Sequence, residues 1–144
     1  MHILYLHQYF ASREGDYSTR SYEFARRLIA RGHQVTMLAS PAFLPPRYHS
    51  KKTEHVVIDD IPVTLIPVAW SNSMSYLQRV QAIIRFAVLA TWYATRVRAD
   101  VVYVSSPPIT IAVVGLAAKL LHRIPMIFEV RDLWPEVPIA IGAL

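Results

Sequence analysis

Three short polar segments each follow a run of apolar residues, and together they hold most of the side chains in this sequence that could do chemistry. They span residues 7–20, 105–108 and 129–136. The last segment places three charges within four residues: Glu129, Arg131 and Asp132. Burying charge is costly unless the group is paired. We therefore predict a site at residues 129–136, in which a carboxylate contacts substrate hydroxyls or takes a proton from an acceptor.

A structural ion pair is the alternative for this last segment. Arg131 paired with a neighbouring carboxylate would order the turn without catalysing anything. Trp134 and Pro135 would shape the wall of the predicted site, with ordinary core packing as the alternative for the tryptophan.

The first polar segment leads into a predicted helix. Gly15, Thr19 and Arg20 stand where free backbone N–H groups and the helix dipole suit a phosphate or carboxylate. Capping of the helix by Ser18 and Thr19 is the alternative. His7 is a further candidate contact, because it stands directly behind the first apolar run. The segment has no G-x-G-x-x-G pattern, which argues against a nicotinamide dehydrogenase.

The second polar segment offers Ser105 and Ser106 as candidate substrate contacts. Their alternative role is to cap the helix predicted to begin at Ile109. The six histidines do not show the spacing of a metal site, so we predict neither a metal nor another cofactor.

Alternating strands and helices must position these segments. The predicted strands are 3–6, 34–39, 101–104 and 126–128, and the predicted helices are 21–31, 75–98 and 109–122. This order predicts an α/β fold: a Rossmann-like parallel sheet with helices on both faces. Residues 56–58 and 63–66 predict a small antiparallel hairpin, and Gly32 a left-handed helix cap. Ligands of such sheets bind beyond the carboxyl ends of the strands, where all three polar segments stand.

Length and composition are those of one folded domain. The chain has 144 residues, of which 53% are hydrophobic, and this composition excludes a disordered chain. The absence of cysteine excludes disulfides and cysteine-based zinc sites. The first residues read as a strand rather than a signal peptide, so we expect a cytoplasmic location. The chain stops inside an apolar stretch, residues 139–144, which we interpret as a truncated domain whose next element is missing.

The net charge of +5 is unevenly distributed. Residues 61–99 contain no acid, and they combine arginines with aromatic residues. The helix at residues 75–98 either presents an ordinary solvated face or contacts an anionic membrane surface. Charged residues interrupt its apolar run, so we do not expect it to span a bilayer. Nucleic acid is not an expected partner, because no recognition motif is present and lysine is scarce.

Five separated blocks of the sequence resemble one known family. They are residues 1–10, 19–28, 31–36, 105–108 and 128–136. In this order they resemble the N-terminal domain of family 4 glycosyltransferases, which have the GT-B fold. The branch that they resemble most is the bacterial surface-polysaccharide enzymes of the N-acetyl-L-fucosamine transferase type.

The resemblance implies a retaining transferase that moves a sugar from a nucleotide diphosphate sugar to a hydroxyl. The acceptor is often a polyprenyl-linked glycan at the cytoplasmic face of the membrane. Residues 1–144 would be the acceptor-side domain, and the C-terminal domain that binds the nucleotide sugar would be absent, so this chain alone is not expected to catalyse transfer. The family's pattern places Asp132 near the catalytic or acceptor-contacting group, and Gly15, Thr19 and Arg20 near the donor phosphates. The family's loop usually carries adjacent glycines, whereas here Asp16 follows Gly15.

Two other classes of protein remain as alternatives. A small-ligand regulatory domain, such as a receiver, shares the parallel architecture. A receiver should have clustered acids after its first strand, but residues 7–9 are His-Gln-Tyr. A membrane-surface module built on residues 75–98 would survive mutation of Asp132 and would respond to salt.

Overall fold

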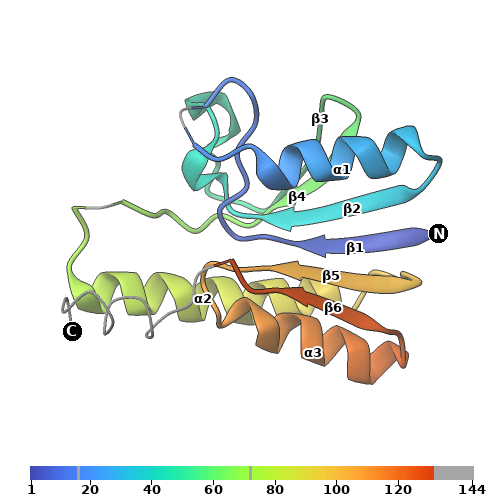
Figure 1. Ribbon diagram of the computed structural model, residues 1–144. Coiled ribbons are helices and arrows are strands. Elements are labelled where there is room, and N and C mark those ends of the chain that lie inside the picture. Colours follow the sequence, from blue (N-terminus) through green and yellow to red (C-terminus); the bar gives the residue numbers. More distant parts are fainter. Residues whose placement is uncertain (16, 72, 132–144) are drawn as a thin grey trace.

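The computed structural model describes residues 1–15, 17–71 and 73–131, and its centre is a six-stranded sheet (Figure 1). The strands are β1 (His2–Leu6), β2 (Gln34–Ala39), β3 (Glu54–Ile58), β4 (Ile61–Leu65), β5 (Val101–Ser105) and β6 (Met126–Glu129). Their order across the sheet is β3-β4-β2-β1-β5-β6. All neighbouring pairs are parallel except β3 and β4. The predicted Rossmann-like α/β fold with an antiparallel excursion is confirmed.

Helices cover both faces of this sheet. They are α1 (Arg20–Ala30), α2 (Tyr76–Ala94) and α3 (Ile111–His122), and two short 3₁₀ helices, η1 (Pro41–Phe43) and η2 (Pro46–Tyr48), follow β2. Figure 1 shows α1 on one face, and α2 and α3 on the other. The inner strands β1, β2 and β5 therefore bury side chains on both faces, which explains their continuous apolar runs in the sequence.

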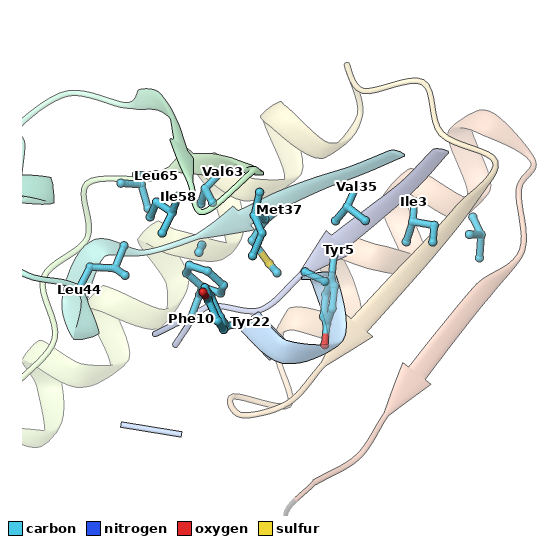
Figure 2. Packing of buried hydrophobic residues seen from close by; sticks show 14 residues of the cluster. Ile3, Tyr5, Phe10, Tyr22, Val35, Met37, Leu44, Ile58, Val63 and Leu65 are labelled. Carbon is cyan, nitrogen blue, oxygen red and sulfur yellow. The ribbon is translucent and has the colours of Figure 1, made fainter. Parts of the chain in front are cut away.

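Alternate residues of β1 divide the core into two layers. Ile3 and Tyr5 pack with residues of α1, among them Tyr22, as Figure 2 shows. Leu4 and Leu6 point to the opposite face, where they join the buried residues of α2 and α3. This two-residue alternation is the geometry of a strand buried on both faces.

The ends of the helices differ in part from the predicted ones. Gly32 has φ +81°, so the predicted left-handed cap of α1 is confirmed. Helix α2 begins after a capping box formed by Ser75 and Gln78, but it ends at Ala94 rather than at residue 98. There the side chain of Thr95 donates to the Thr91 carbonyl at 2.8 Å, and the chain turns away. Helix α3 begins at Ile111, two residues later than predicted.

The hairpin between β3 and β4 is tighter than predicted. Asp59 and Asp60 alone form its turn, and their φ values are +46° and +67°. Two central residues with positive φ match the twist of the flanking strands, and aspartate tolerates this backbone region. As a result β4 begins at Ile61, and Pro62 lies within the strand opposite Val57.

Helix α3 lies unusually close to β5. A Cβ atom added to Gly115 would lie 2.4 Å from Cγ2 of Val104 and 3.2 Å from Sδ of Met126. Only glycine fits at this contact without a shift of the neighbouring side chains. The close packing holds β5 and β6 in place, and the carboxyl ends of these strands carry polar residues.

Candidate functional site

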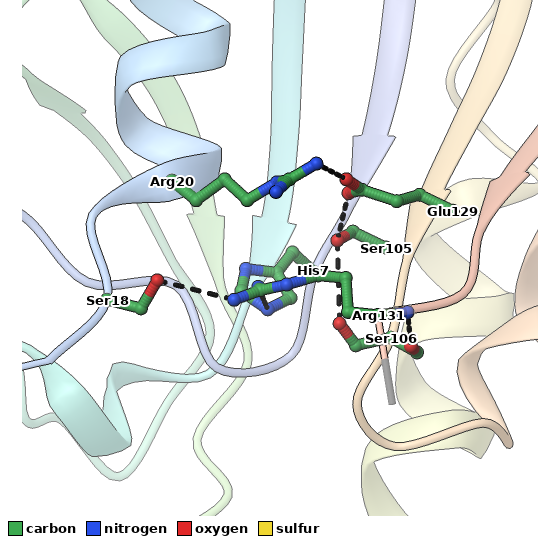
Figure 3. Close-up of polar contacts among 7 residues, drawn as sticks. All are labelled: His7, Ser18, Arg20, Ser105, Ser106, Glu129 and Arg131. Atoms are coloured by element: carbon green, nitrogen blue, oxygen red, sulfur yellow. Dashed lines mark hydrogen bonds and ion pairs between the residues drawn. The ribbon is translucent and has the colours of Figure 1, made fainter. Parts of the chain in front are cut away.

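The carboxyl ends of β1, β5 and β6 lie side by side, because these strands are adjacent and parallel. Polar side chains at these ends meet others from the segment that enters α1 (Figure 3). We call this group the polar cluster; it consists of His7, Ser18, Arg20, Ser21, Ser105, Ser106, Glu129 and Arg131.

Glu129 organises one half of the polar cluster. It stands opposite Ser105 in the β5–β6 register, and Ser105 Oγ donates to its Oε2 atom at 2.7 Å. Its Oε1 atom forms an ion pair with Arg20, at the start of α1. The side chain of Glu129 is only 15% exposed, whereas that of Arg20 is 60% exposed. This carboxylate therefore connects α1 to the edge of β5 and β6.

Tyr103 of β5 lies within the electrostatic influence of the same carboxylate. Burial and then the negative charge of Glu129 raise the pKa of the Tyr103 hydroxyl. The phenol is consequently neutral at physiological pH, and it is not a base.

Arg131 organises the other half. Its backbone N–H donates to Ser106 Oγ at 2.8 Å, which fixes the chain directly after β6. Its guanidinium reaches across the strand ends, where Nη1 donates to His7 Nε2 and Nη2 donates to Ser18 Oγ, both at 3.3 Å. Figure 3 shows the guanidinium between these two residues. Arg131 thus joins β6, β1 and the entrance of α1.

His7 is the buried member of the polar cluster, with 1% of its surface exposed. Arginine has no acceptor, so His7 Nε2 must accept the hydrogen bond from Arg131. The proton is then on Nδ1, which donates to Ser21 Oγ at 2.8 Å. Burial, and then the positive charge of Arg131, lower the pKa of His7 from 6.5 to about 3. His7 is therefore neutral at physiological pH and orients the guanidinium of Arg131.

The arrangement suits the binding of hydroxyls and anions. A guanidinium has five N–H donors, and the contacts of Arg131 with His7 and Ser18 leave some of them available. Such donors bind phosphate or carboxylate oxygens strongly. Glu129 supplies carboxylate oxygens that can accept from a ligand hydroxyl. In the described ranges, no group of three His, Asp or Glu side chains is placed to hold a metal ion.

A match to a family model establishes the family of this chain. The model of the glycosyl transferase 4-like domain matches residues 15–143. The chain belongs to this family. It is a glycosyltransferase domain, and its sheet is a Rossmann-like half of the GT-B architecture. No curated protein sequence matches it significantly.

Two solved structures are similar to this glycosyltransferase domain in fold. The C-terminal domain of a hydrogenase from Pyrococcus furiosus, residues 78–226, has a TM-score of 0.60 and 14% identity, over 89% of this chain and 90% of that chain. MurG from Acinetobacter baumannii has a TM-score of 0.52 and 21% identity, over 91% of this chain and 35% of that chain. At these identities the likeness shows the fold alone.

The glycosyltransferase domain brings together most of the residues predicted from the sequence. Six of them lie in the polar cluster: His7, Arg20, Ser105, Ser106, Glu129 and Arg131. Ser21 was missed, since it was included only as the first residue of the predicted helix 21–31. The signal that could have found it is a hydroxyl on a buried helix face, which needs a partner.

Several alternatives from the sequence are wrong. Ser105 and Ser106 do not cap α3; their hydroxyls bond to Glu129 and to the backbone of Arg131. Thr19 precedes α1, but its side chain makes no capping hydrogen bond. The alternative ion pair between Arg131 and a neighbouring carboxylate stays a prediction, because Asp132 lies outside the described residues; Glu129 pairs with Arg20.

For three predicted site residues, Gly15, Thr19 and Asp132, the predicted role stays a prediction. Gly15 packs against η1, because its N–H donates to the Ser12 carbonyl at 3.1 Å and an added Cβ would lie 3.0 Å from the Phe43 carbonyl oxygen. Its predicted contact with a phosphate stays a prediction, as does that of Thr19. Asp132 lies outside the described residues, together with Trp134 and Pro135.

Proposed function

We propose that this domain is the acceptor-binding half of a retaining glycosyltransferase. The enzyme moves a hexosyl or N-acetylaminosugar residue from a nucleotide diphosphate sugar to a hydroxyl of a glycan acceptor. The acceptor is linked to a polyprenyl lipid, and the product belongs to a bacterial surface polysaccharide such as lipopolysaccharide. The resemblance to N-acetyl-L-fucosamine transferases supports an amino sugar, and a second domain supplies most contacts with the nucleotide.

One observation carries this proposal: the polar cluster lies at the carboxyl edge of the sheet of a glycosyl transferase 4-like domain. Ligands of open parallel sheets bind at this edge. We assign Glu129 and Ser105 to the acceptor hydroxyls, and Arg20 and Arg131 to the negative charge of the diphosphate. Asp132, which follows Arg131 in the sequence, is the proposed catalytic or acceptor-contacting carboxylate.

The test is sugar transfer by the complete enzyme. A panel of UDP- and GDP-sugars is offered to membranes that contain the polyprenyl-linked acceptor, with the parent protein and with Arg20→Ala, Asp132→Asn and Arg27→Ala. Arg27 is the matched control, because it lies exposed on α1 without a described ion pair. We expect transfer to collapse in the first two variants and to persist in the third. Absence of transfer with every donor, or equal rates in all variants, would contradict the proposal.

We also propose that the enzyme is a cytoplasmic, peripheral protein at the inner face of the membrane. The support is an outward stripe on α2: Leu77, Ile84, Val88 and Trp92, each between 51% and 71% exposed. Their spacing of seven, four and four residues keeps them on one side of the helix. Arg96 lies over the Trp92 ring, with its Cζ atom 3.5 Å from the ring centroid. Apolar side chains flanked by arginines suit an anionic lipid surface. In the described part of the chain, no helix is long and apolar enough to cross the membrane.

Vesicle sedimentation tests the membrane proposal. The double variant Ile84→Ser and Val88→Ser should lose binding to vesicles of phosphatidylglycerol, and binding by the parent should weaken in high salt. Val57→Ser is the control, because Val57 is equally exposed but lies on β3. Sedimentation of the double variant with vesicles at the level of the parent would contradict the proposal.

A further inference from the structure

A hollow lies at the same edge of the sheet as the polar cluster, beyond the carboxyl ends of β2 and β4. It has a volume of about 410 Å³. Its walls come from η1, the loop after η2, residues 67–70 and the side of α2. Figure 1 shows the chain after β4 running between the short helices and α2. We call it the β2–β4 pocket, and none of its described lining residues belongs to the polar cluster.

Among the residues that the structure describes, the β2–β4 pocket carries positive charge without a counter-charge. Lys51 and Arg85 line it, and none of its described lining residues is acidic. Neither cation makes an ion pair or hydrogen bond within the described ranges. By contrast, the nearby Arg47 is neutralised, because its guanidinium forms an ion pair with Glu14. Unpaired cations around one hollow raise the local concentration of anions.

An aromatic wall stands next to these cations. Trp70 is half-buried, and its ring packs against the buried Tyr9 with 5.2 Å between the ring centroids. This contact holds the indole in place while it lines the β2–β4 pocket. The loop that carries Lys51 is also held, because His49 Nε2 donates to the Leu44 carbonyl at 3.0 Å. A held aromatic face beside a few polar groups is the usual make-up of a small-molecule site.

We propose that the β2–β4 pocket binds a phosphorylated sugar, with its phosphate contacted by Lys51 and Arg85 and its ring against Trp70. The volume lies within the range of about 300–1,000 Å³ that is usual for ligand sites. The inference rests on the proposed function and names the phosphate-bearing part of the acceptor as the occupant. Since β2 is the neighbour of β1, an acceptor held here by its phosphate can extend toward the polar cluster.

The test is binding without any donor sugar. The protein is labelled with 5-fluorotryptophan, and its ¹⁹F NMR spectrum is followed during titration with N-acetylglucosamine 1-phosphate. Trp70→Phe identifies the Trp70 resonance. We expect this resonance to shift, and the dissociation constant to rise about tenfold or more in Lys51→Met and in Arg85→Gln, as loss of a charged contact implies. Lys52→Met is the matched control and should bind like the parent, because Lys52 does not line the pocket.

Three further arms decide between sources of the anion. Uncharged N-acetylglucosamine should not bind, and inorganic phosphate should bind more weakly than the sugar phosphate. Vesicles of phosphatidylglycerol should bind equally well to the parent and to Lys51→Met. Equal affinity of the parent and the pocket variants would overturn the proposal, as would phosphate alone binding as tightly as the sugar phosphate. Loss of vesicle binding in Lys51→Met without any binding of the sugar phosphate would identify a lipid headgroup and overturn it too.

The outcome is separable from that of the proposed function. Binding of the sugar phosphate by an enzyme that transfers no sugar would refute the function and leave the pocket. Transfer that is equally fast in the parent, Lys51→Met and Arg85→Gln at limiting acceptor would refute the pocket and leave the function.

Discussion

The polar cluster and the β2–β4 pocket lie at the same edge of one sheet, yet their charges are arranged in opposite ways. In the cluster, Glu129 meets Arg20 and Ser105, and the guanidinium of Arg131 meets His7 and Ser18. In the pocket, Lys51 and Arg85 meet no partner in the described part of the chain. A connected network of hydrogen bonds holds its members in one geometry, so a change in one member disturbs the others. Unpaired cations act separately, so their loss should change affinity rather than folding.

The largest effect on folding is expected for Glu129→Ala. Its removal leaves the buried Ser105 hydroxyl with only a long contact, 3.5 Å, to the Ser106 carbonyl, and it removes the ion pair that links α1 to β6. Loss of a partly buried charged partner costs about 2–3 kcal/mol of unfolding free energy. Denaturant titration measures this free energy. Glu129→Gln should lose less stability than Glu129→Ala, because its amide oxygen can still accept from Ser105. If Glu129→Ala lost less unfolding free energy than Lys51→Met, the claim that the polar cluster supports folding and the pocket does not would be contradicted.

Two glycines give the next comparison. Gly115→Ala should cost about 1–3 kcal/mol, because the new methyl group would meet Val104 in the packed layer under the cluster. Gly15→Ala, beside η1 on the pocket side, should cost less, since the Phe43 carbonyl lies in a loop that can move by the few tenths of an ångström required. Thermal unfolding of both variants tests the order. A larger loss in Gly15→Ala would contradict the packing described for α3.

A pH dependence distinguishes the cluster from the pocket. The pKa of His7 is lowered to about 3 in the folded state, against 6.5 in the unfolded state. Between these values only the unfolded chain binds the proton, so stability falls as the pH drops from 6.5 toward 3. The loss is about 1.4 kcal/mol per pH unit.

His7→Gln should remove this contribution, because glutamine can bond to Arg131 without titrating. Unfolding free energies of the parent and the variant, measured from pH 7 to pH 5, give the difference in slope. Parallel curves would show that His7 is not held neutral. Variants of Lys51 should follow the curve of the parent, since the pocket contains no described group in contact with His7.

Within the polar cluster, the smallest expected effect on folding is that of Arg20→Gln. The side chain of Arg20 is 60% exposed, so solvent screens its ion pair with Glu129. We expect a loss below about 1 kcal/mol in denaturant titration. A loss as large as that of Glu129→Ala would mean that Arg20 acts mainly in folding.

The sequence was sufficient to locate the polar cluster because its positions follow from the order of strands. Apolar runs identified β1, β5 and β6, and the rule for parallel sheets then grouped His7, Ser105 and Glu129. Individual hydrogen bonds could not be predicted from the sequence. The bond between Ser21 and His7, for example, depends on side-chain rotamers. The end of α2 was also missed, because Val97 continues the run of apolar residues past Thr95, whereas the helix ends at Ala94.

The β2–β4 pocket could not be predicted from the sequence. Its walls come from segments that are far apart in the chain, and the segment after β2 had the proline-rich pattern of an ordinary loop. Two 3₁₀ helices, each with a proline in its first turn, give this loop its shape. The meeting of Lys51 with Trp70 and Arg85 depends on tertiary packing, which local patterns do not encode.

The central claim is that the polar cluster serves sugar transfer, and Arg131→Met tests it most directly. This substitution keeps an unbranched apolar stem and removes the guanidinium that His7 and Ser18 hold. The initial rate of transfer to the polyprenyl-linked acceptor is compared with that of Arg27→Met, at equal folded protein. We predict that the rate falls by about 100-fold or more in Arg131→Met, which corresponds to a rise of about 2.7 kcal/mol or more in the barrier. The rate should be unchanged in Arg27→Met. Equal rates in the two variants would contradict the assignment of this cluster to transfer.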